Sequence, residues 1–153
     1  MTLRAEPITT LEQAQQMRHI RNDGFMGYSN VRRVITAEEQ VVWWNANKNS
    51  AYGPIRAWLF YHGNSVVGYG LLSPADTVLT VWVPSAGVHV EARGRGYGKE
   101  IVTFLASQGL PLYAQALKSN PAAVRTHIPR FWVKTGEDET YVYFATRNAE
   151  DPL

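Results

Sequence analysis

The first third of the chain shows a short strand pattern followed by two helical patterns. Residues 3–7 have the composition of an opening strand. Apolar residues then recur at every third position from Leu11 to Ile20, which places them on one face of a helix. Thr36 and Glu39 have the spacing of a capping box, so a second helix is expected to begin at this point.

The middle of the chain is rich in apolar, β-branched and aromatic residues and predicts strands separated by turns. Three strands are expected, at residues 55–61, 65–72 and 77–83. The sequence His62-Gly63-Asn64 is typical of a hairpin turn between the first two. Pro84 and Gly87 then interrupt the apolar run, and we expect a bulge or bend there.

The rest of the chain predicts two further helices and two further strands. A helix opens in a glycine-rich stretch and ends near Gly109; a strand follows at 110–117, a short helix at 122–128 and a last strand at 141–146. The expected order is β-α-α-β-β-β-α-β-α-β. This order predicts an α+β fold in a single domain over residues 1–153, with largely antiparallel strands and one parallel crossover.

Composition narrows the class of protein. The 153 residues are 45% hydrophobic and 18% charged, which is typical of a globular domain and argues against disorder. The absence of cysteine excludes a disulfide framework, a thiolate metal site and a cysteine nucleophile, and it favours a cytoplasmic location. No spacing of histidine and carboxylate residues suggests a metal. No apolar run is long enough for a membrane span, and no signal-peptide pattern is present.

The stretch from Val88 to Lys99 combines three glycines with three cations, at the junction of a strand pattern and a helical pattern. Such a loop presents backbone N–H groups and a helix N-terminus, which together bind phosphate. Lys99 stands where the dinucleotide-binding fingerprint needs glycine, and Glu100 stands where the P-loop needs Ser or Thr. The sequence therefore matches neither of these two phosphate-binding motifs. The pattern that remains is R-x-x-G-x-G, beginning at Arg93.

With the preceding residues 88–92, this pattern resembles the acetyl-CoA signature of the GCN5-related N-acetyltransferase (GNAT) superfamily. The resemblance implies a mixed, mostly antiparallel central sheet flanked by helices, with acetyl-CoA as co-substrate. It implies that the strand before the loop binds the pantetheine arm through its backbone, and that the loop binds the pyrophosphate. The residues expected at the coenzyme are Gly87, Val88, Val90, Arg93, Gly94, Arg95, Gly96, Tyr97, Gly98, Lys99 and Asn120.

A second segment, residues 120–136, is similar to the late motif of the same family. Asn120 matches that motif, and His127 stands where the family's tyrosine acts as general acid. His127 is therefore the candidate catalytic residue, since an ordinary histidine pKa of about 6.5 suits a proton donor near neutrality. Two alternatives stay open: His127 caps or packs the short helix, or Tyr141 or Tyr143 supplies the acid.

The resemblance also implies that the first two helices form one wall of the acceptor pocket. Trp43 and Trp44 are the candidate substrate residues, with core packing as the alternative. Three nearby arginines either receive an anionic acceptor or form a solvated face; they are Arg21, Arg32 and Arg33. No general base is assigned; the residues that could serve as one are His89, Glu91 and Asp76.

The function expected from these features is an acyl-CoA-dependent N-acyltransferase that passes an acetyl group directly to a primary amine. The acceptor is left open between a small molecule, a modified nucleotide and a protein N-terminus, and a homodimer is left open as the assembly. Two alternatives remain: a catalytically silent CoA-binding module, and a nucleic-acid-binding protein whose basic glycine loop binds phosphates. The net charge of +2 is too small to favour nucleic acid by itself.

Overall fold

The computed structural model describes residues 2–23, 34–48, 55–74 and 81–149. Its helices and strands, in chain order, are β1 (Arg4–Pro7), α1 (Leu11–Asp23), α2 (Ala37–Asn47), β2 (Arg56–His62), β3 (Ser65–Pro74), β4 (Trp82–Val88), α3 (Tyr97–Ala106), β5 (Tyr113–Leu117), α4 (Pro121–Arg125), β6 (Trp132–Glu137) and β7 (Tyr141–Thr146). Short 3-10 turns cover Val90–Ala92 and Arg147–Ala149. The α+β class is confirmed, and the expected order is corrected by one added strand, β6.

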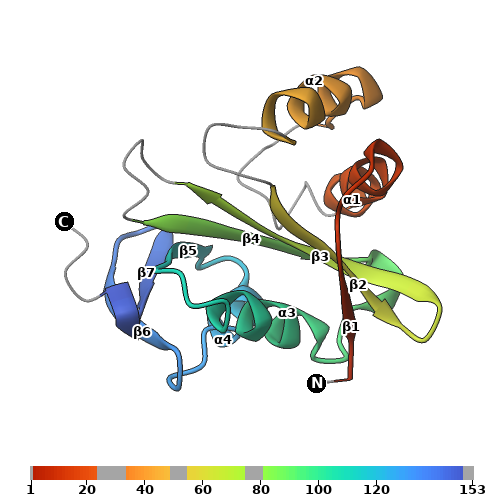
Figure 1. The fold of residues 1–153 in the computed structure, drawn as a ribbon. Helices are drawn as coiled ribbons and strands as arrows, with labels where there is room; N and C mark the ends of the chain where they lie inside the picture. The colour runs from red at the N-terminus through yellow and green to blue at the C-terminus, as the bar shows by residue number, and fades with distance from the viewer. Residues whose placement is uncertain (1, 24–33, 49–54, 75–80, 150–153) are drawn as a thin grey trace.

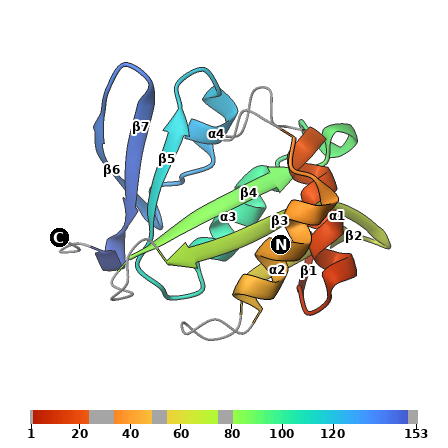
Figure 2. The same cartoon turned by 90° about the horizontal axis from the view of Figure 1, so that it is seen from above.

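The strands form two antiparallel sheets that meet at one point. One sheet has the order β1-β2-β3-β4 and the other β5-β7-β6. They are joined by a parallel bridge between Trp82 and Leu112, where the Trp82 N–H donates to the Pro111 carbonyl over 2.9 Å. From this bridge β4 and β5 diverge, as Figure 2 shows. Helices α1 and α2 lie on one face of the sheets and α3 and α4 on the other (Figure 1).

Strand β4 pairs with β3 without interruption as far as Val88, which contradicts the bulge or bend expected at Pro84 and Gly87. Its pairing with β3 continues from Trp82 to Val88 without a register shift. Proline is tolerated at this position because β4 is the edge of its sheet, so the missing N–H belongs to the unpaired side. The strand expected at 77–83 begins only at Trp82, with 77–80 outside the described residues.

Two clusters of buried side chains hold these layers together. The larger lies between α3 and the sheets and includes Ile101 and Leu105, both fully buried. Burial of each such side chain stabilises the fold by about 1.5–3 kcal/mol. Helix α3 packs closely because β3 has glycine beneath it: a Cβ on Gly68 would lie 2.7 Å from Ile101 Cδ1. The second cluster lies between β3 and the pair α1–α2.

Hydrogen bonds between α1 and the start of α2 fix the geometry of the second cluster. The predicted capping box is confirmed: Thr36 Oγ1 accepts from Glu39 N over 3.1 Å, and Glu39 Oε1 accepts from Thr36 N over 3.2 Å. Asn22 and Ile35 exchange two hydrogen bonds of 2.9 Å. The buried Gln40 amide donates to the Ala14 carbonyl over 2.7 Å, which ties the two helices together.

The last third of the chain departs most from the expected elements. Helix α4 ends at Arg125, well before Pro129, so it is shorter than the predicted 122–128. Its first residue is Pro121, and Asn120 caps it by accepting from Ala123 N over 3.3 Å. Strand β6 follows at Trp132–Glu137 and pairs with β7.

Candidate active site

The glycine-rich stretch forms an open turn at the N-terminus of α3. Gly94 and Gly96 have φ angles of 80° and 83°, in the left-handed region that glycine adopts without strain. A Cβ on either would meet nothing within 4 Å, so the outer side of the turn is open. Gly96 is the N-cap of α3 and offers no side chain to its first N–H groups. The turn therefore leaves these donors for an anion, at the positive end of a ten-residue helix.

The side chains around this turn differ in their exposure to solvent. Arg95 and Lys99 are exposed, so their charges lie in solvent beside the open turn. The Tyr97 ring is buried in the larger core cluster, so only its backbone is available to a ligand. Arg93 is half-buried and its Nε donates to the Val88 carbonyl over 3.2 Å, which fastens the loop to the end of β4. Val90, in the connecting 3-10 turn, is 51% exposed.

The unpaired edge of β4 presents backbone groups beside the open turn. His89 N bonds to β3, at Val67 O over 2.7 Å, whereas Trp82 N bonds away from β3. Because N–H groups alternate along an antiparallel strand, those of Ala86 and Val88 point away from β3, toward the side where β5 diverges. The Gly87 N–H points toward β3. Gly87 instead makes room for a ring, since its Cβ would lie 2.4 Å from Tyr69 Cε1.

Three segments converge where β4 ends. A Cβ on Gly98 would lie 3.7 Å from Thr126 Cγ2 and 3.8 Å from Val88 Cγ2. The first turn of α3, the end of β4 and the residues after α4 therefore meet at this glycine. His127 follows Thr126 directly, so the structure brings the candidate catalytic residue to the same region as the glycine turn. Asn120 is buried and supports this region as the cap of α4.

The His127 imidazole is half-buried among aromatic rings. It stacks on Phe144 with centroids 4.3 Å apart and meets Trp132 edge-on at 4.7 Å. Its Nδ1 lies 3.0 Å from the Ala123 carbonyl, and because a carbonyl only accepts, Nδ1 carries the proton and Nε2 has the lone pair. Burial lowers the pKa of His127 to about 4, although hydrogen bonds to the Ala123 and Val124 backbone oppose the shift. The ring is thus neutral at pH 7, and the ordinary pKa expected from sequence is corrected.

Two of the other titratable candidates, Tyr143 and His89, have side-chain partners. The Tyr143 hydroxyl donates to Asp138 Oδ2 over 2.5 Å, which raises the pKa of Tyr143 and orders the β6–β7 turn. His89 Nε2 lies 3.7 Å from Oδ2 of Asp23, which is the last residue of α1. Three of the residues considered from sequence lie outside the described part of the chain: Arg32, Arg33 and Asp76.

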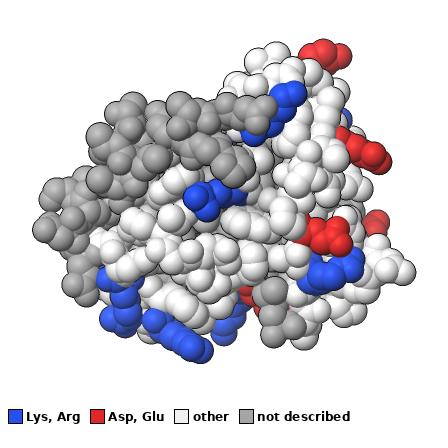
Figure 3. Space-filling model, in the orientation of Figure 1, with Lys and Arg blue, Asp and Glu red and all other residues white. Residues whose placement is uncertain are grey.

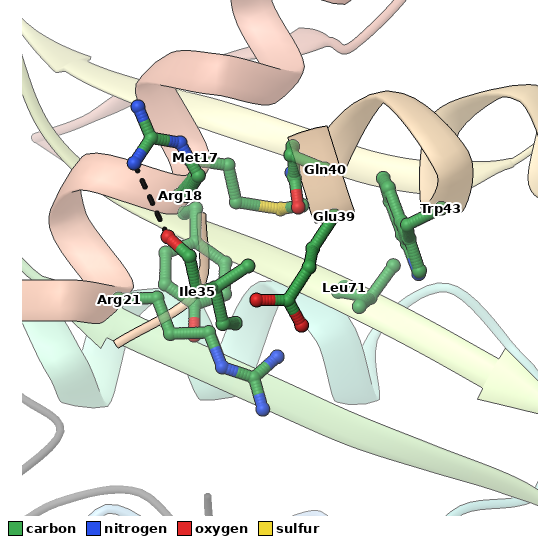
Figure 4. A pocket seen from close by; sticks show the side chains of 9 residues that line it. Met17, Arg18, Arg21, Ile35, Glu39, Gln40, Trp43 and Leu71 are labelled. Carbon is green, nitrogen blue, oxygen red and sulfur yellow. Dashed lines mark hydrogen bonds between the residues drawn. The ribbon is translucent and has the colours of Figure 1, made fainter. Parts of the chain in front are cut away.

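A pocket of about 200 Å³ opens between α1, α2 and β3 (Figure 4). It is lined by Met17, Arg18, Arg21, Ile35, Glu39, Gln40, Trp43, Tyr69 and Leu71. Trp43 therefore faces a cavity, whereas Trp44 is 7% exposed and packs in the second core cluster. Sequence reasoning missed Tyr69, Leu71 and Glu39 as pocket residues, because β3 and α2 are far apart in the sequence and only the fold brings them together.

Some kinds of site are not found in the described residues. No group of three metal-ligating side chains occurs there. Within the same residues, no helix is long and apolar enough to cross a membrane. On the face shown in Figure 3, basic and acidic side chains are dispersed among uncharged ones, with several basic ones along the lower edge. The described residues of that face form no continuous basic surface of the kind typical of nucleic-acid binding.

Comparison with known proteins gives one family match and several similar folds. Residues 14–128 match a family model described as the acetyltransferase (GNAT) family. No curated protein sequence matches the chain. Similar solved structures include a GNAT superfamily phosphinothricin acetyltransferase from Sinorhizobium meliloti in complex with acetyl-CoA, with TM-score 0.76 and 14% identity over 95% of this chain and 88% of that one.

Two further structures share the fold at similarly low identity. A spermidine N-acetyltransferase from Vibrio cholerae, in complex with CoA and spermine, has TM-score 0.74 and 14% identity, and the match covers 94% of each chain. A ribosomal-protein-alanine N-acetyltransferase from Brucella melitensis has TM-score 0.71 and 17% identity, over 95% of this chain and 99% of that one.

Proposed function

This chain belongs to the acetyltransferase (GNAT) family, and on that premise we propose that it transfers an acetyl group from acetyl-CoA directly to a primary amine. Enzymes of this family use acetyl-CoA as co-substrate, and the fold of this chain is shared by structures determined with it. The observation that carries the proposal is the open glycine turn at the N-terminus of α3, beside the unpaired edge of β4.

The residues of the turn fit the diphosphate of the coenzyme. Its left-handed glycines keep Cβ atoms away from an approaching phosphate, and the uncapped N–H groups are donors of the kind that phosphate accepts from. We assign the backbone from Arg95 to Lys99 to this contact, with the exposed charges of Arg95 and Lys99 at its rim. Gly94 shapes the turn, and Arg93 holds it against β4.

We assign the coenzyme's pantetheine arm to the outer edge of β4. Ala86 and Val88 point their N–H groups to that side, so they replace Gly87 as the hydrogen-bonding residues of the strand. Gly87 acts indirectly, because it admits the Tyr69 ring. We also assign to the coenzyme site Val90, which is exposed in the turn after β4, and Asn120, which caps α4.

When bound, the coenzyme supplies a thioester: the amine nitrogen forms the new C–N bond, the C–S bond breaks, and the proton lost by nitrogen ends on sulfur. Holding the two reactants together removes a large entropic barrier. A backbone N–H of β4 directed at the thioester oxygen would stabilise the charge that develops there. The chain has no cysteine, and direct transfer requires no covalent enzyme intermediate.

For His127 we propose a catalytic place beside the sulfur, in the neutral form. With a pKa of about 4, only about one ring in a thousand is protonated at pH 7, so the imidazolium is not an effective proton donor there. The Nε2 lone pair instead accepts a hydrogen bond, while the Ala123 carbonyl holds the Nδ1 proton. His127 thereby orients a thiol or a water and helps the proton of the amine to reach sulfur.

Two measurements test the proposal. Acetyl-CoA should raise the melting temperature of the protein, because a ligand that binds only the folded state stabilises it. Acetyl-CoA mixed with a panel of primary amines should release free thiol at a rate that depends on the amine. Stabilisation without thiol release from any amine would identify a silent CoA-binding module. No stabilisation at saturating acetyl-CoA would contradict the proposal altogether.

A further inference from the structure

The pocket between α1, α2 and β3 contains a cation, Arg21, that has no partner within the part of the chain that the structure describes. Arg18 lines the same pocket, but its Nε donates to Gln15 Oε1 over 2.6 Å and its guanidinium donates to the Ile35 carbonyl over 3.2 Å, the bond drawn in Figure 4. Arg21, one turn later on α1, is half-buried and forms no hydrogen bond or ion pair among the described residues. Its guanidinium is therefore available to a ligand.

The pocket that Arg21 lines is close to the part of β4 assigned to the coenzyme. Asp23 follows Arg21 by two residues on α1. Its Oδ2 lies 3.7 Å from Nε2 of His89, which is the residue directly after β4. Tyr69, which lines the pocket, lies over Gly87, and its hydroxyl is 3.4 Å from Ser85 Oγ on β4. Because Tyr69 both lines the pocket and contacts β4, the pocket borders the strand along which the thioester is proposed to bind.

The charges on the pocket wall indicate what kind of acceptor fits. The wall has two arginines and one carboxylate, Glu39, whose Oε1 already accepts from the Thr36 N–H. A planar guanidinium binds carboxylates through paired hydrogen bonds, and partial burial strengthens them. A polycation would instead meet two positive charges and one negative charge. The unpartnered charge thus favours a ligand with an anionic group.

The size of the pocket and its apolar wall narrow the class of acceptor further. Its volume of about 200 Å³ is smaller than the roughly 300–1,000 Å³ of sites for drug-sized ligands. Met17, Leu71 and the Trp43 ring supply apolar contacts on the remaining wall. We propose that this pocket binds the acceptor, and that Arg21 selects a small amine that carries a carboxylate and an apolar side chain, such as an apolar amino acid. This inference rests on the proposed acetyl transfer.

The test compares acceptors that differ only in the carboxylate. Methionine is paired with 3-(methylthio)propylamine and phenylalanine with 2-phenylethylamine, and thiol release from acetyl-CoA gives kcat and KM for each. Wild-type protein should favour the amino acid in kcat/KM by at least ~10-fold. Arg21→Gln should raise the KM for the amino acid by ~10- to 100-fold with little change in kcat, the range expected for a lost hydrogen-bonded ion pair.

Controls separate Arg21 from general damage. Arg21→Gln should leave the KM for the decarboxylated amine within about twofold, and Arg21→Lys should restore part of the amino-acid preference. Arg4→Gln removes an exposed cation of β1 that does not line the pocket, and it should change the KM of neither the amino acid nor the decarboxylated amine. Equal activity with both members of each pair, or an equal loss for both in Arg21→Gln, overturns the inference while leaving acetyl transfer intact.

Binding without turnover distinguishes this inference from the proposed function. Calorimetric titration of the amino acid into protein saturated with CoA should give heat that is lost in Arg21→Gln and retained in Arg4→Gln. If no amine releases thiol but this binding is observed, the proposed acetyl transfer fails and the carboxylate site stands. If the titration shows no binding and no amino acid is acetylated, the carboxylate site fails.

Discussion

Two glycines at opposite ends of α3 provide a matched test of the anion site. Gly96 and Gly109 have φ angles of 83° and 84°, and a Cβ on either would meet nothing within 4 Å. Alanine in the left-handed region costs about 1–2 kcal/mol, partly offset by about 0.4–1 kcal/mol from a less flexible unfolded chain. Both substitutions should therefore lower the stability by about 1 kcal/mol, which is ~2–4 °C in melting temperature for a chain of this length.

Only Gly96→Ala should also weaken the binding of acetyl-CoA. Its methyl group would stand at the N-cap of α3, in front of the N–H groups assigned to the diphosphate. Hydrogen bonds to charged groups contribute about 1.5–3 kcal/mol, so the loss of one corresponds to ~10- to 100-fold weaker binding. Calorimetric titration with acetyl-CoA measures the affinity, and thermal unfolding without ligand measures the stability of each variant.

The comparison has a clear refuting result. If both variants lose the same stability and bind acetyl-CoA equally well, the diphosphate does not contact the start of α3. If Gly109→Ala weakens binding as much as Gly96→Ala, the loss comes from the strained backbone and not from the site. Either result would remove the main support for coenzyme binding at this turn.

Three further predictions concern residues around the site. The pKa of His127 is about 4 in the folded chain and 6.5 in the unfolded one, so the unfolded state takes up a proton first and the free energy of unfolding should fall by at most about 3 kcal/mol between pH 6.5 and pH 4. Urea unfolding at pH 7 and pH 4.5 should show a smaller loss of stability for His127→Phe than for wild type. An equal loss in both proteins would refute the lowered pKa. Gly87→Ala should destabilise by ~1–3 kcal/mol in urea unfolding through contact with the Tyr69 ring, and the double variant with Tyr69→Leu should recover part of the loss. Asn120→Ala should lower the stability by about 1 kcal/mol through loss of the α4 cap, whereas Asn120→Asp should keep most of it; equal melting temperatures for wild type and Asn120→Ala would show that the cap contributes nothing.

Elements set by local chemistry could be predicted from the sequence. The capping box at Thr36 and the start of α3 beside Gly96 depend on residues within one helical turn, and both are present in the structure. The strand register at Pro84 could not be predicted in this way, because a proline is tolerated or disruptive according to whether its strand is an edge. Edge position depends on where β5 lies, and that is a tertiary property.

Strand β6 was missed for a related reason. Trp132 is buried, but Val133, Lys134 and Thr135 after it are exposed, so the segment lacks the apolar alternation of a half-buried strand. Its position comes from pairing with β7.

The candidate site likewise combines features set by contiguous residues with features set by tertiary contacts. The anion turn was located by its glycines and cations alone, which are contiguous in sequence. The lowered pKa of His127 depends on Phe144 and Trp132, which reach it from β7 and β6. The proposed acceptor pocket is formed by side chains from α1, α2 and β3, and no spacing within one segment reveals that Arg21 and Trp43 line the same pocket.

Pro84 also bears on how the protein avoids self-association. An uncovered strand edge is a template on which another chain can add a strand, and such growth needs a donor at every second residue. The outward-facing positions of β4 are Trp82, Pro84, Ala86 and Val88; Pro84 has no N–H, and the Trp82 N–H already donates to the Pro111 carbonyl. Only the donors of Ala86 and Val88 remain for a partner, so an added strand could not pair along the full length of β4, and this edge can stay open to a coenzyme without promoting fibril-like stacking of copies.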